Sequence, residues 1–322
     1  MTIRKIGVLT SGGDAPGMNA CVRAIVRTAA YHNIEVMGIV RGYEGMIHGD
    51  IRELTTRDVG GIIQQGGTIL QTARSEDFRT KRGQREAIRQ LNESGIDAVV
   101  VVGGDGSLNG ARALASYGVK VLGVPASIDN DIWGTSMSIG VDTALNTIIH
   151  AVDQLRDTAS SHNRAFIVEV MGRNCGYLAM VSAVIAGAEM VLLPEVPVDI
   201  QKVAKVIETS YMKGKNHAIL IVAEGATFRA PALAQELKDL DVGFHTRVTI
   251  LGHIQRGGRP TAFDRMLATR LGVRAVEALL EGENDAMVGL DDEGMVLVPL
   301  EEVVSKMRSV NEDYLELFKR VA

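Results

Sequence analysis

Two acidic runs in this sequence each follow an apolar stretch. Residues 103–107 (GGDGS) come directly after residues 98–102 (AVVVV), and residues 127–131 (SIDND) follow residues 120–125 (KVLGVP). Unbroken apolar stretches are typical of parallel strands buried on both faces, and ligands bind at the carboxyl ends of such strands. Glycines there let backbone N–H groups approach an anionic oxygen, and a carboxylate can hold a magnesium ion that bridges phosphates. The two runs therefore predict a phosphoryl-transfer site.

The carboxylates of these runs have alternative roles. Asp105 lies between glycines and is a candidate magnesium ligand; the alternative is a helix N-cap, a role that Ser107 could also fill. Asp129 and Asp131 flank Asn130, so they would point the same way in an extended loop, whereas in a turn one would cap and the other face a cleft. Near a substrate hydroxyl such a carboxylate is the general base of a kinase. Taken together, the acids predict a metal and a base at one site.

A third glycine-rich run, residues 10–17 (TSGGDAPG), follows an apolar stretch at residues 6–9 and precedes a helix expected from about Gly17. Free N–H groups and the positive end of the helix dipole make such a junction an anion site. The alternative is that the glycines serve only the steric needs of a strand-to-helix turn.

Arginines add candidate phosphate ligands, because a guanidinium group binds phosphate oxygens in a bidentate manner. Six lie in predicted loops or beside glycines: Arg74, Arg79, Arg164, Arg173, Arg247 and Arg256. In an acidic chain this pattern favours anion binding over simple surface placement. His253 could donate to phosphate or satisfy a backbone carbonyl.

Composition limits the classes of protein. A chain of 322 residues predicts two domains, and 46% hydrophobic with 23% charged residues is typical of a globular protein. The formal net charge of −5 argues against nucleic acid as a partner. No basic apolar leader and no apolar run near twenty residues is present, so we expect no membrane span and a cytoplasmic protein. Cys21 and Cys175 lack a second ligand at metal-binding spacing and are expected in the core.

The order of expected elements predicts two α/β lobes. Strands are expected at residues 6–9, 35–40 and 98–102, with helices from about residue 17 and through residues 86–91. A second series has strands at residues 165–170, 218–223 and 248–251, with helices near residues 177 and 203. This alternation predicts βαβ units and parallel sheets. No Pro/Ser-rich linker separates the lobes, so we expect a broad interface and a cleft between them.

Over nearly its whole length the chain resembles the bacterial ATP-dependent 6-phosphofructokinases. The resemblance rests on residues 7–20 (GVLTSGGDAPGMNA), 103–107, 128–131, 168–173 (VEVMGR) and 251–258 (LGHIQRGG). It implies an α/β fold of two Rossmann-like lobes with mostly parallel sheets. Residues 1–140 and 256–305 would form a larger, ATP-binding lobe, and residues 141–255 and 306–322 a smaller, sugar-phosphate-binding lobe. The implied reaction transfers the γ-phosphoryl group of Mg-ATP to carbon 1 of fructose 6-phosphate, in glycolysis.

The resemblance also implies roles for individual residues. Asp129 would be the base, Ser127 would hydrogen-bond the transferred phosphoryl group, and Arg173 would stabilise it. Asp105 would hold Mg²⁺. ATP would be bound by Gly13, Arg74, Arg79, Gly104, Asp105, Gly106 and Ser107. The sugar would be bound by Met171, Gly172 and Glu224, and its 6-phosphate by Arg164, Arg247, His253 and Arg256.

Similar enzymes are homotetramers in which Arg164 and Arg247 reach the sugar phosphate of the neighbouring subunit. An allosteric nucleotide site is expected at another interface, with the matching positions Arg23, Arg27, Arg156, Gly187, Glu189, Lys213 and Lys215. The chain departs from the family at Ser127, where Thr is frequent, at Thr56, where an effector-binding Arg is expected, and at Gly61, where many relatives have an acid. The catalytic departure keeps a hydroxyl group, whereas the effector departure predicts weak or altered regulation.

Two other functions are compatible with parts of this pattern. A pyrophosphate-dependent phosphofructokinase on the same fold would usually have Asp at the position of Gly106 and Lys at that of Ala126. A non-catalytic sugar-phosphate sensor would be expected to lose Asp105 or Asp129, and both are present. The residues therefore favour the ATP-dependent enzyme.

Overall fold

The computed structural model describes residues 3–161 and 164–321. They form two compact units, each with its own β-sheet. The first unit contains residues 3–127, 132–143 and 256–307, and the second contains residues 128–131, 144–161, 164–255 and 308–321. The run 128–131 groups with the second unit, whereas the sequence-based boundary at residue 140 placed it in the first.

The first unit contains a seven-stranded sheet in the order β11-β10-β5-β4-β1-β2-β3. Its strands are β1 (Lys5–Ser11), β2 (Glu35–Ile39), β3 (Ile51–Glu53), β4 (Ala98–Gly103), β5 (Lys120–Pro125), β10 (Ala286–Leu290) and β11 (Met295–Pro299). The five inner strands are parallel, and the edge strands β3 and β11 are antiparallel to their neighbours. The valines of β4 are completely buried, as expected of a strand covered on both faces.

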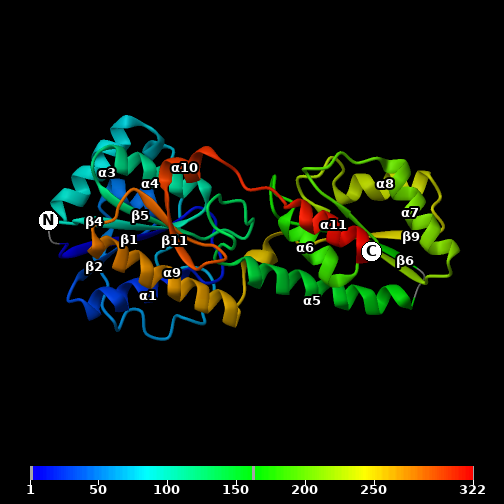
Figure 1. Cartoon of the computed structure of the whole chain (residues 1–322), viewed down its shortest axis with the longest axis horizontal. Helices are drawn as coiled ribbons and strands as arrows, with labels where there is room; N and C mark the ends of the chain where they lie inside the picture. The colour runs from blue at the N-terminus through cyan, green and yellow to red at the C-terminus, as the bar shows by residue number, and fades with distance from the viewer. Residues whose placement is uncertain (1–2, 162–163, 322) are drawn as a thin grey trace. The chain divides into compact units, whose positions relative to one another are not determined.

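Helices cover both faces of this sheet (Figure 1). On one face, α1 (Met18–Tyr31) packs against α9 (Ala262–Glu281). The other face carries α2 (Gly42–His48), the 3-10 helix η1 (Asp77–Arg79), α3 (Lys81–Glu93), α4 (Asp105–Ser116) and α10 (Leu300–Ser305). Val99 and Val101 of β4 belong to the apolar cluster under this second group of helices. Because side chains alternate along a strand, Val100 and Val102 point to the face of α1 and α9.

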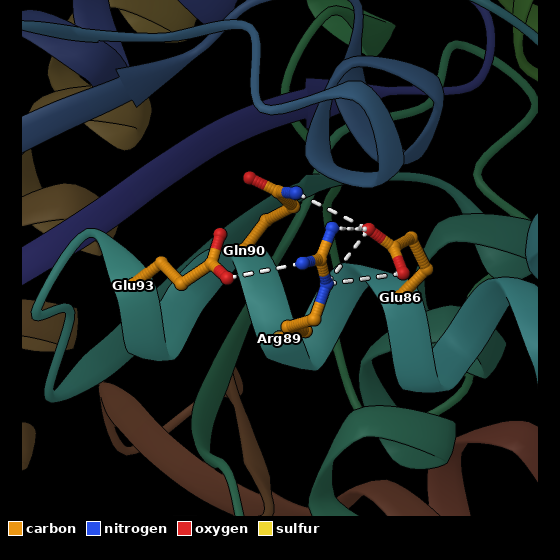
Figure 2. Close-up of polar contacts among 4 residues, drawn as sticks. All are labelled: Glu86, Arg89, Gln90 and Glu93. Atoms are coloured by element: carbon orange, nitrogen blue, oxygen red, sulfur yellow. Dashed lines mark hydrogen bonds and ion pairs between the residues drawn. The ribbon is translucent and has the colours of Figure 1, made fainter.

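Figure 2 shows a set of polar contacts along the outer surface of α3. Arg89 Nε donates to Glu86 Oε1 at 3.0 Å and Arg89 Nη1 to Glu93 Oε1 at 3.1 Å, while Gln90 Nε2 donates to Glu86 Oε1 at 3.2 Å. Residues three or four apart are neighbours on a helix surface. Exposed pairs contribute little because water screens them, so the burial of residues such as Leu91 holds α3 in place.

The second unit contains a four-stranded parallel sheet in the order β7-β8-β6-β9. Its strands are β6 (Arg164–Val170), β7 (Met190–Leu192), β8 (His217–Ala223) and β9 (His245–Ile250). Its helices are α5 (Val141–Ser160), which begins in the first unit, α6 (Tyr177–Ala186), α7 (Ile200–Met212), α8 (Ala230–Asp239), the 3-10 helix η2 (Gly252–Arg256) and α11 (Glu312–Val321). The sheet packs against α7 and α8 through apolar residues such as Ile207 and Leu233.

The predicted fold class, α/β with mostly parallel sheets, is confirmed. The expected strands and the helices α1, α3, α6 and α7 lie where the sequence patterns placed them. The sequence analysis did not predict the short strands β3 and β7, the pair β10 and β11, or the helices α2, α5, α8, α9, α10 and α11. Cys21 and Cys175 are both buried, and burial raises the pKa of the Cys175 thiol to about 11. None of the described helices is both long and apolar enough to span a bilayer.

Candidate active site

In the first unit, three adjacent parallel strands end side by side, and a loop follows each of them. The register pairs Ser11 of β1 with Gly103 of β4, and Gly103 with Pro125 of β5. The backbone N–H of Ala126, just beyond β5, donates to Gly103 O at 3.0 Å. The loops after β1 and β4 contain the runs 10–17 and 103–107 that the sequence singled out. Ser127 begins the third run, whose residues 128–131 belong to the second unit. The carboxyl ends of the strands of an open α/β sheet are where ligands bind.

The loop after β4 opens directly into α4. Gly104 precedes the helix in an extended conformation and Asp105 is its first residue. Asp105 is exposed, and its Oδ1 accepts a hydrogen bond from Asn109 Nδ2 at 3.1 Å. A Cβ atom added at Gly106 would meet no atom within 4 Å, so the helix start faces open space there. The positive end of the helix dipole is thus open to an anion.

Asp105 also suits a magnesium ion. Mg²⁺ usually keeps several water ligands and is held by one or two carboxylates together with substrate phosphates. Among the described residues no three His, Cys, Asp or Glu side chains gather as a preformed metal cage. A single exposed carboxylate beside an open helix start fits a metal that arrives with a nucleotide.

Gly13 leaves room for an arginine. A Cβ atom at this position would lie 1.8 Å from Arg256 Nη1, so any side chain would displace the guanidinium group. Arg256 Nε is buried and has no hydrogen-bond partner. Arg256 therefore belongs to the first unit beside the glycine-rich loop, whereas the other three predicted 6-phosphate ligands, Arg164, Arg247 and His253, belong to the second.

In the second unit, Asp129 and Arg173 form an ion pair. Arg173 Nε lies 3.3 Å from Asp129 Oδ2, and the exposed fractions of the two side chains are 57% and 3%. Both sit beside left-handed backbone, at Asn130 (φ 52°) and at Arg173 itself (φ 50°). Non-glycine residues rarely adopt this conformation, and those that do are concentrated at functional sites. Asp129 thus lies in a turn, not in an extended loop.

The loop after β8 fixes the conformation of Arg173. Glu224 Oε1 accepts a hydrogen bond from the Arg173 N–H at 2.9 Å. A Cβ atom at Gly225 would lie 2.0 Å from Arg173 O, and one at Gly172 (φ 136°) would lie 2.4 Å from Cys175 O. Glycine is required at both positions because the backbones approach so closely. The predicted sugar ligands Gly172 and Glu224 are therefore brought together with Arg173.

Gln255 is a supporting residue that the sequence analysis missed. It is completely buried, its Oε1 accepts from Met171 N at 3.2 Å, and its Nε2 donates to Gly252 O at 2.9 Å. It ties η2, which carries the exposed His253, to the carboxyl end of β6. The sequence could have indicated this role through the position of Gln255 between His253 and Arg256, because a buried polar side chain in such a turn needs hydrogen-bond partners.

Arg164 and Arg247 lie far from Arg173. Arg164 is the first residue of β6, and Arg173 follows the other end of that strand, so the length of the strand, about 20 Å, separates them. Arg247 of β9 is paired in register with Phe166, which places it on the same sheet face as Arg164. These two arginines form a separate pair on edge strand β9 and its neighbour.

The other predicted ATP ligands, and Ser127, differ in how far they are exposed. Ser107 is buried, its Oγ has no hydrogen-bond partner, and its carbonyl accepts from Tyr43 Oη at 2.6 Å. Arg74 is exposed. Arg79 ends η1 and lies 3.4 Å from Glu76 in an exposed ion pair. Ser127 is half-buried next to Gly104.

Four predicted effector residues cluster in the second unit around the end of α6. Arg156 Nη2 donates to Ala186 O, next to Gly187, whose left-handed backbone (φ 58°) ends the helix. Glu189 Oε1 lies 3.1 Å from Lys215 Nζ, and its Oε2 accepts from Ile219 N at 2.7 Å. Lys213 is exposed at the end of α7. Arg23 and Arg27 lie one turn apart on α1, in the first unit.

Comparison with known proteins decides the family. A family model described as phosphofructokinase matches residues 5–279. The chain belongs to the phosphofructokinase family. Among curated relatives, the ATP-dependent 6-phosphofructokinase of Natranaerobius thermophilus is 51% identical over 315 residues, 98% of each chain. That of Halalkalibacterium halodurans is 49% identical over 320 residues, 99% of this chain and 100% of the relative.

Solved phosphofructokinase structures share the fold. The phosphofructokinase of Saccharomyces cerevisiae superposes with a TM-score of 0.88 at 39% identity, over 94% of this chain and 45% of that longer chain. A pyrophosphate-dependent phosphofructokinase from Marinobacter aquaeolei superposes with a TM-score of 0.87 at 22% identity, over 99% of this chain and 92% of the other. At that identity the second likeness indicates the fold alone.

Proposed function

We propose that this phosphofructokinase transfers the γ-phosphoryl group of ATP to carbon 1 of fructose 6-phosphate, giving fructose 1,6-bisphosphate and ADP. The observation that carries the proposal is the buried Asp129 carboxylate beside the Arg173 guanidinium. The proposal is supported by curated relatives about half identical over their whole length that are named ATP-dependent 6-phosphofructokinases.

Asp129 and Arg173 have complementary tasks in this reaction. The Asp129 carboxylate accepts the proton of the carbon-1 hydroxyl as that oxygen bonds to phosphorus, which is the general-base task in kinases. Arg173 stabilises charge on the transferred phosphoryl oxygens, a role that suits its exposed guanidinium. Its backbone is fixed by Glu224, so the charge is positioned before substrate arrives. Ser127 would donate a hydrogen bond to the same group.

The nucleotide would be bound by the first unit. Phosphate oxygens would accept hydrogen bonds from the N–H groups around Gly13 and Gly104–Gly106, with Arg74 and Arg79 as further cationic ligands. Asp105 would hold Mg²⁺, which, when bound, neutralises phosphate charge and orients the oxygens of ATP. The chain's own contribution is an open helix start whose partial positive charge attracts the phosphates.

The same residues argue against pyrophosphate as donor. Gly106 faces open space, which leaves room for the rest of a nucleotide, whereas Asp there would place a second negative charge beside Asp105. Ala126 is 1% exposed and paired with Ile139 in a β-bridge, so this chain has no ammonium group at the position where the pyrophosphate-dependent relatives usually carry one.

A coupled assay with fructose 6-phosphate as acceptor tests donor and acceptor together. We expect turnover with Mg-ATP, and turnover at least about a hundredfold lower with Mg-pyrophosphate at equal concentration. Pyrophosphate lacks the adenosine group, so it cannot make the contacts that the protein makes to the rest of the nucleotide. Chelation of magnesium should abolish turnover. Equal or faster reaction with pyrophosphate would overturn the ATP assignment, and no reaction with either donor would overturn the enzymatic one.

We also propose a cytoplasmic homotetramer. Arg164 and Arg247 share a sheet face remote from Arg173, so they would bind the 6-phosphate held by a neighbouring subunit. Light scattering would measure the assembly: a mass four times that of the 34.5 kDa chain is expected, and a monomer that is fully active would refute it.

Regulation is proposed to be weak or altered. Thr56 is exposed and lacks the charge that an arginine would bring to an effector phosphate. The loss of such a charge-assisted contact lowers the affinity for the effector by about ten- to a hundredfold. Titration of ADP and phosphoenolpyruvate at subsaturating fructose 6-phosphate should give weak responses, and Thr56→Arg should strengthen them. Micromolar responses to both in the unaltered protein would contradict this.

A further inference from the structure

Asp264, in the first turn of α9, carries a buried carboxylate that accepts three hydrogen bonds. The residue is completely buried. Its Oδ1 accepts from Gly140 N at 2.9 Å, and its Oδ2 accepts from Thr143 N at 2.8 Å and from Thr143 Oγ1 at 2.5 Å. Burial raises the pKa of Asp264, opposed by these hydrogen bonds. A buried carboxylate is costly, so it is retained only where its oxygens are fully used.

The segment that Asp264 holds lies beside the end of β5. Ile139 N donates to Pro125 O at 3.1 Å, and Ile139 forms a β-bridge with Ala126, the residue before Ser127. Gly140 follows Ile139 directly in the chain, and Thr143 lies three residues further on. The position of Asp264 is therefore transmitted through Gly140, Ile139 and Ala126 to the start of the run 127–131.

The same junction supports the glycine-rich loop after β1. A Cβ atom at Gly17 (φ 114°) would lie 2.7 Å from Ile139 Cγ2 and 3.5 Å from Asp264 O. A Cβ atom at Gly140 (φ 103°) would lie 2.8 Å from Ala15 Cβ. Both glycines adopt a backbone that favours glycine and both leave space for the opposite segment. The loop 10–17, the segment 139–143 and the first turn of α9 thus pack together at one point of the first unit.

We propose that Asp264 is a positioning residue for phosphoryl transfer: its carboxylate holds the loop 10–17 and the start of the run 127–131 in their relative positions. The inference rests on the proposed function, because it assigns those loops to ATP and to the transferred group. Asp264 touches neither substrate and acts through Gly140, Ile139 and Ala126.

The chemistry of the site requires a carboxylate. An amide has one oxygen and one NH₂ group, so Asp264→Asn would set donor against donor at either Gly140 N or Thr143 N. Thr143 Oγ1 also accepts from Thr261 N at 3.1 Å, so the Thr143 hydroxyl serves both sides of the junction. Thr143→Val removes that hydroxyl and Thr143→Ser keeps it.

Steady-state kinetics of Asp264→Asn with Mg-ATP and fructose 6-phosphate test the proposal. We expect turnover to fall about tenfold and half-saturation by ATP to rise about tenfold, the scale of a misplaced reacting group. Leu279→Ala is the matched control, because it cuts a buried side chain in the last turns of the same helix. It should lower the thermal midpoint while changing both constants less than twofold. If Asp264→Asn fails to fold, Thr143→Val should show the same kinetic pattern, smaller, and Thr143→Ser should restore it.

Hydrogen exchange gives a readout that does not depend on activity. In Asp264→Asn or Thr143→Val, amides of residues 10–17 and 126–128 should exchange at least about tenfold faster, with no such change in Leu279→Ala. Kinetic constants and exchange like those of the unaltered protein would show that Asp264 is structural only. Absence of ATP-dependent turnover in the unaltered protein, with the exchange pattern present, would refute the proposed function and leave the junction intact.

Discussion

The two units differ in the groups that they present at their candidate ligand-binding ends: mainly backbone groups in the first unit and mainly side chains in the second. In the first unit the loops after β1 and β4 present glycines, backbone N–H groups and an open helix start. In the second unit the loops after β6 and β8 present charged side chains, Asp129, Arg173 and Glu224, on left-handed or closely packed backbone. Backbone groups can bind any phosphate, whereas fixed side chains can move protons and stabilise developing charge. The difference predicts that substitutions in the loop 10–17 affect mainly ATP binding, and that substitutions of Asp129 affect mainly turnover.

Asp129→Asn should have the largest effect. Loss of a positioned general base lowers turnover by roughly 10²–10⁴-fold, while half-saturation by either substrate changes little. Turnover is measured at saturating substrates, and a thermal unfolding scan confirms that the variant is folded. Near-normal turnover would remove Asp129 from the chemistry and break the comparison.

Arg247→Ala should raise the half-saturation concentration for fructose 6-phosphate by about ten- to a hundredfold, because a charge-assisted contact to a non-reacting phosphate is lost. Turnover at saturation should stay close to normal. Arg320→Ala removes the same charge from exposed α11 and serves as control. A collapse of turnover with unchanged sugar affinity would assign Arg247 to the transition state instead.

Gly13→Ala should weaken ATP binding by about tenfold, because the new methyl group would collide with the Arg256 guanidinium and push the glycine-rich loop out of place. If that collision is the cause, the double variant Gly13→Ala/Arg256→Ala should bind ATP no worse than Arg256→Ala alone. Additive losses in this double-mutant cycle would mean that Gly13 acts independently of Arg256.

Arg89→Ala should have the smallest effect. Hydrogen bonding to Arg89 lowers the pKa of Glu86, so any contribution of the pair to stability is present above the ordinary glutamate range and lost as pH falls through the lowered pKa. Because the pair is exposed, the thermal midpoint at pH 7 should stay within the scatter of repeat measurements. A large drop in that midpoint would show that the contacts in Figure 2 hold α3 in place.

Much of this architecture could be predicted from local pattern. The unbroken apolar stretch at residues 98–102, the largely apolar stretch at residues 165–170 and the glycines after each indicate where ligand-binding loops lie, because burial on both faces and strand direction leave few alternatives. The edge strands β3 and β7 were not predicted because each is three residues long, which is too short to show a hydrophobic alternation in the sequence.

The rest depends on contacts between distant segments. Nothing in the sequence sets Asp264 apart from other acidic residues, and its role appears only when Gly140 and Thr143 are placed against it. Likewise, nothing local to Arg256 indicates that its guanidinium lies over Gly13, or that Arg173 adopts a left-handed backbone. The proposed roles of the site residues remain predictions.

A single experiment compares the two units directly: turnover of Gly13→Ala and Asp129→Asn at saturating Mg-ATP and fructose 6-phosphate. If the loop 10–17 serves to bind ATP and Asp129 serves to move the proton, turnover of Gly13→Ala should recover to within about threefold of the unaltered enzyme, because saturation offsets a loss of uniform binding. Asp129→Asn should stay roughly 10²–10⁴-fold slower at every ATP concentration. Recovery of Asp129→Asn at saturation, or a persistent defect of that size in Gly13→Ala, would contradict the division.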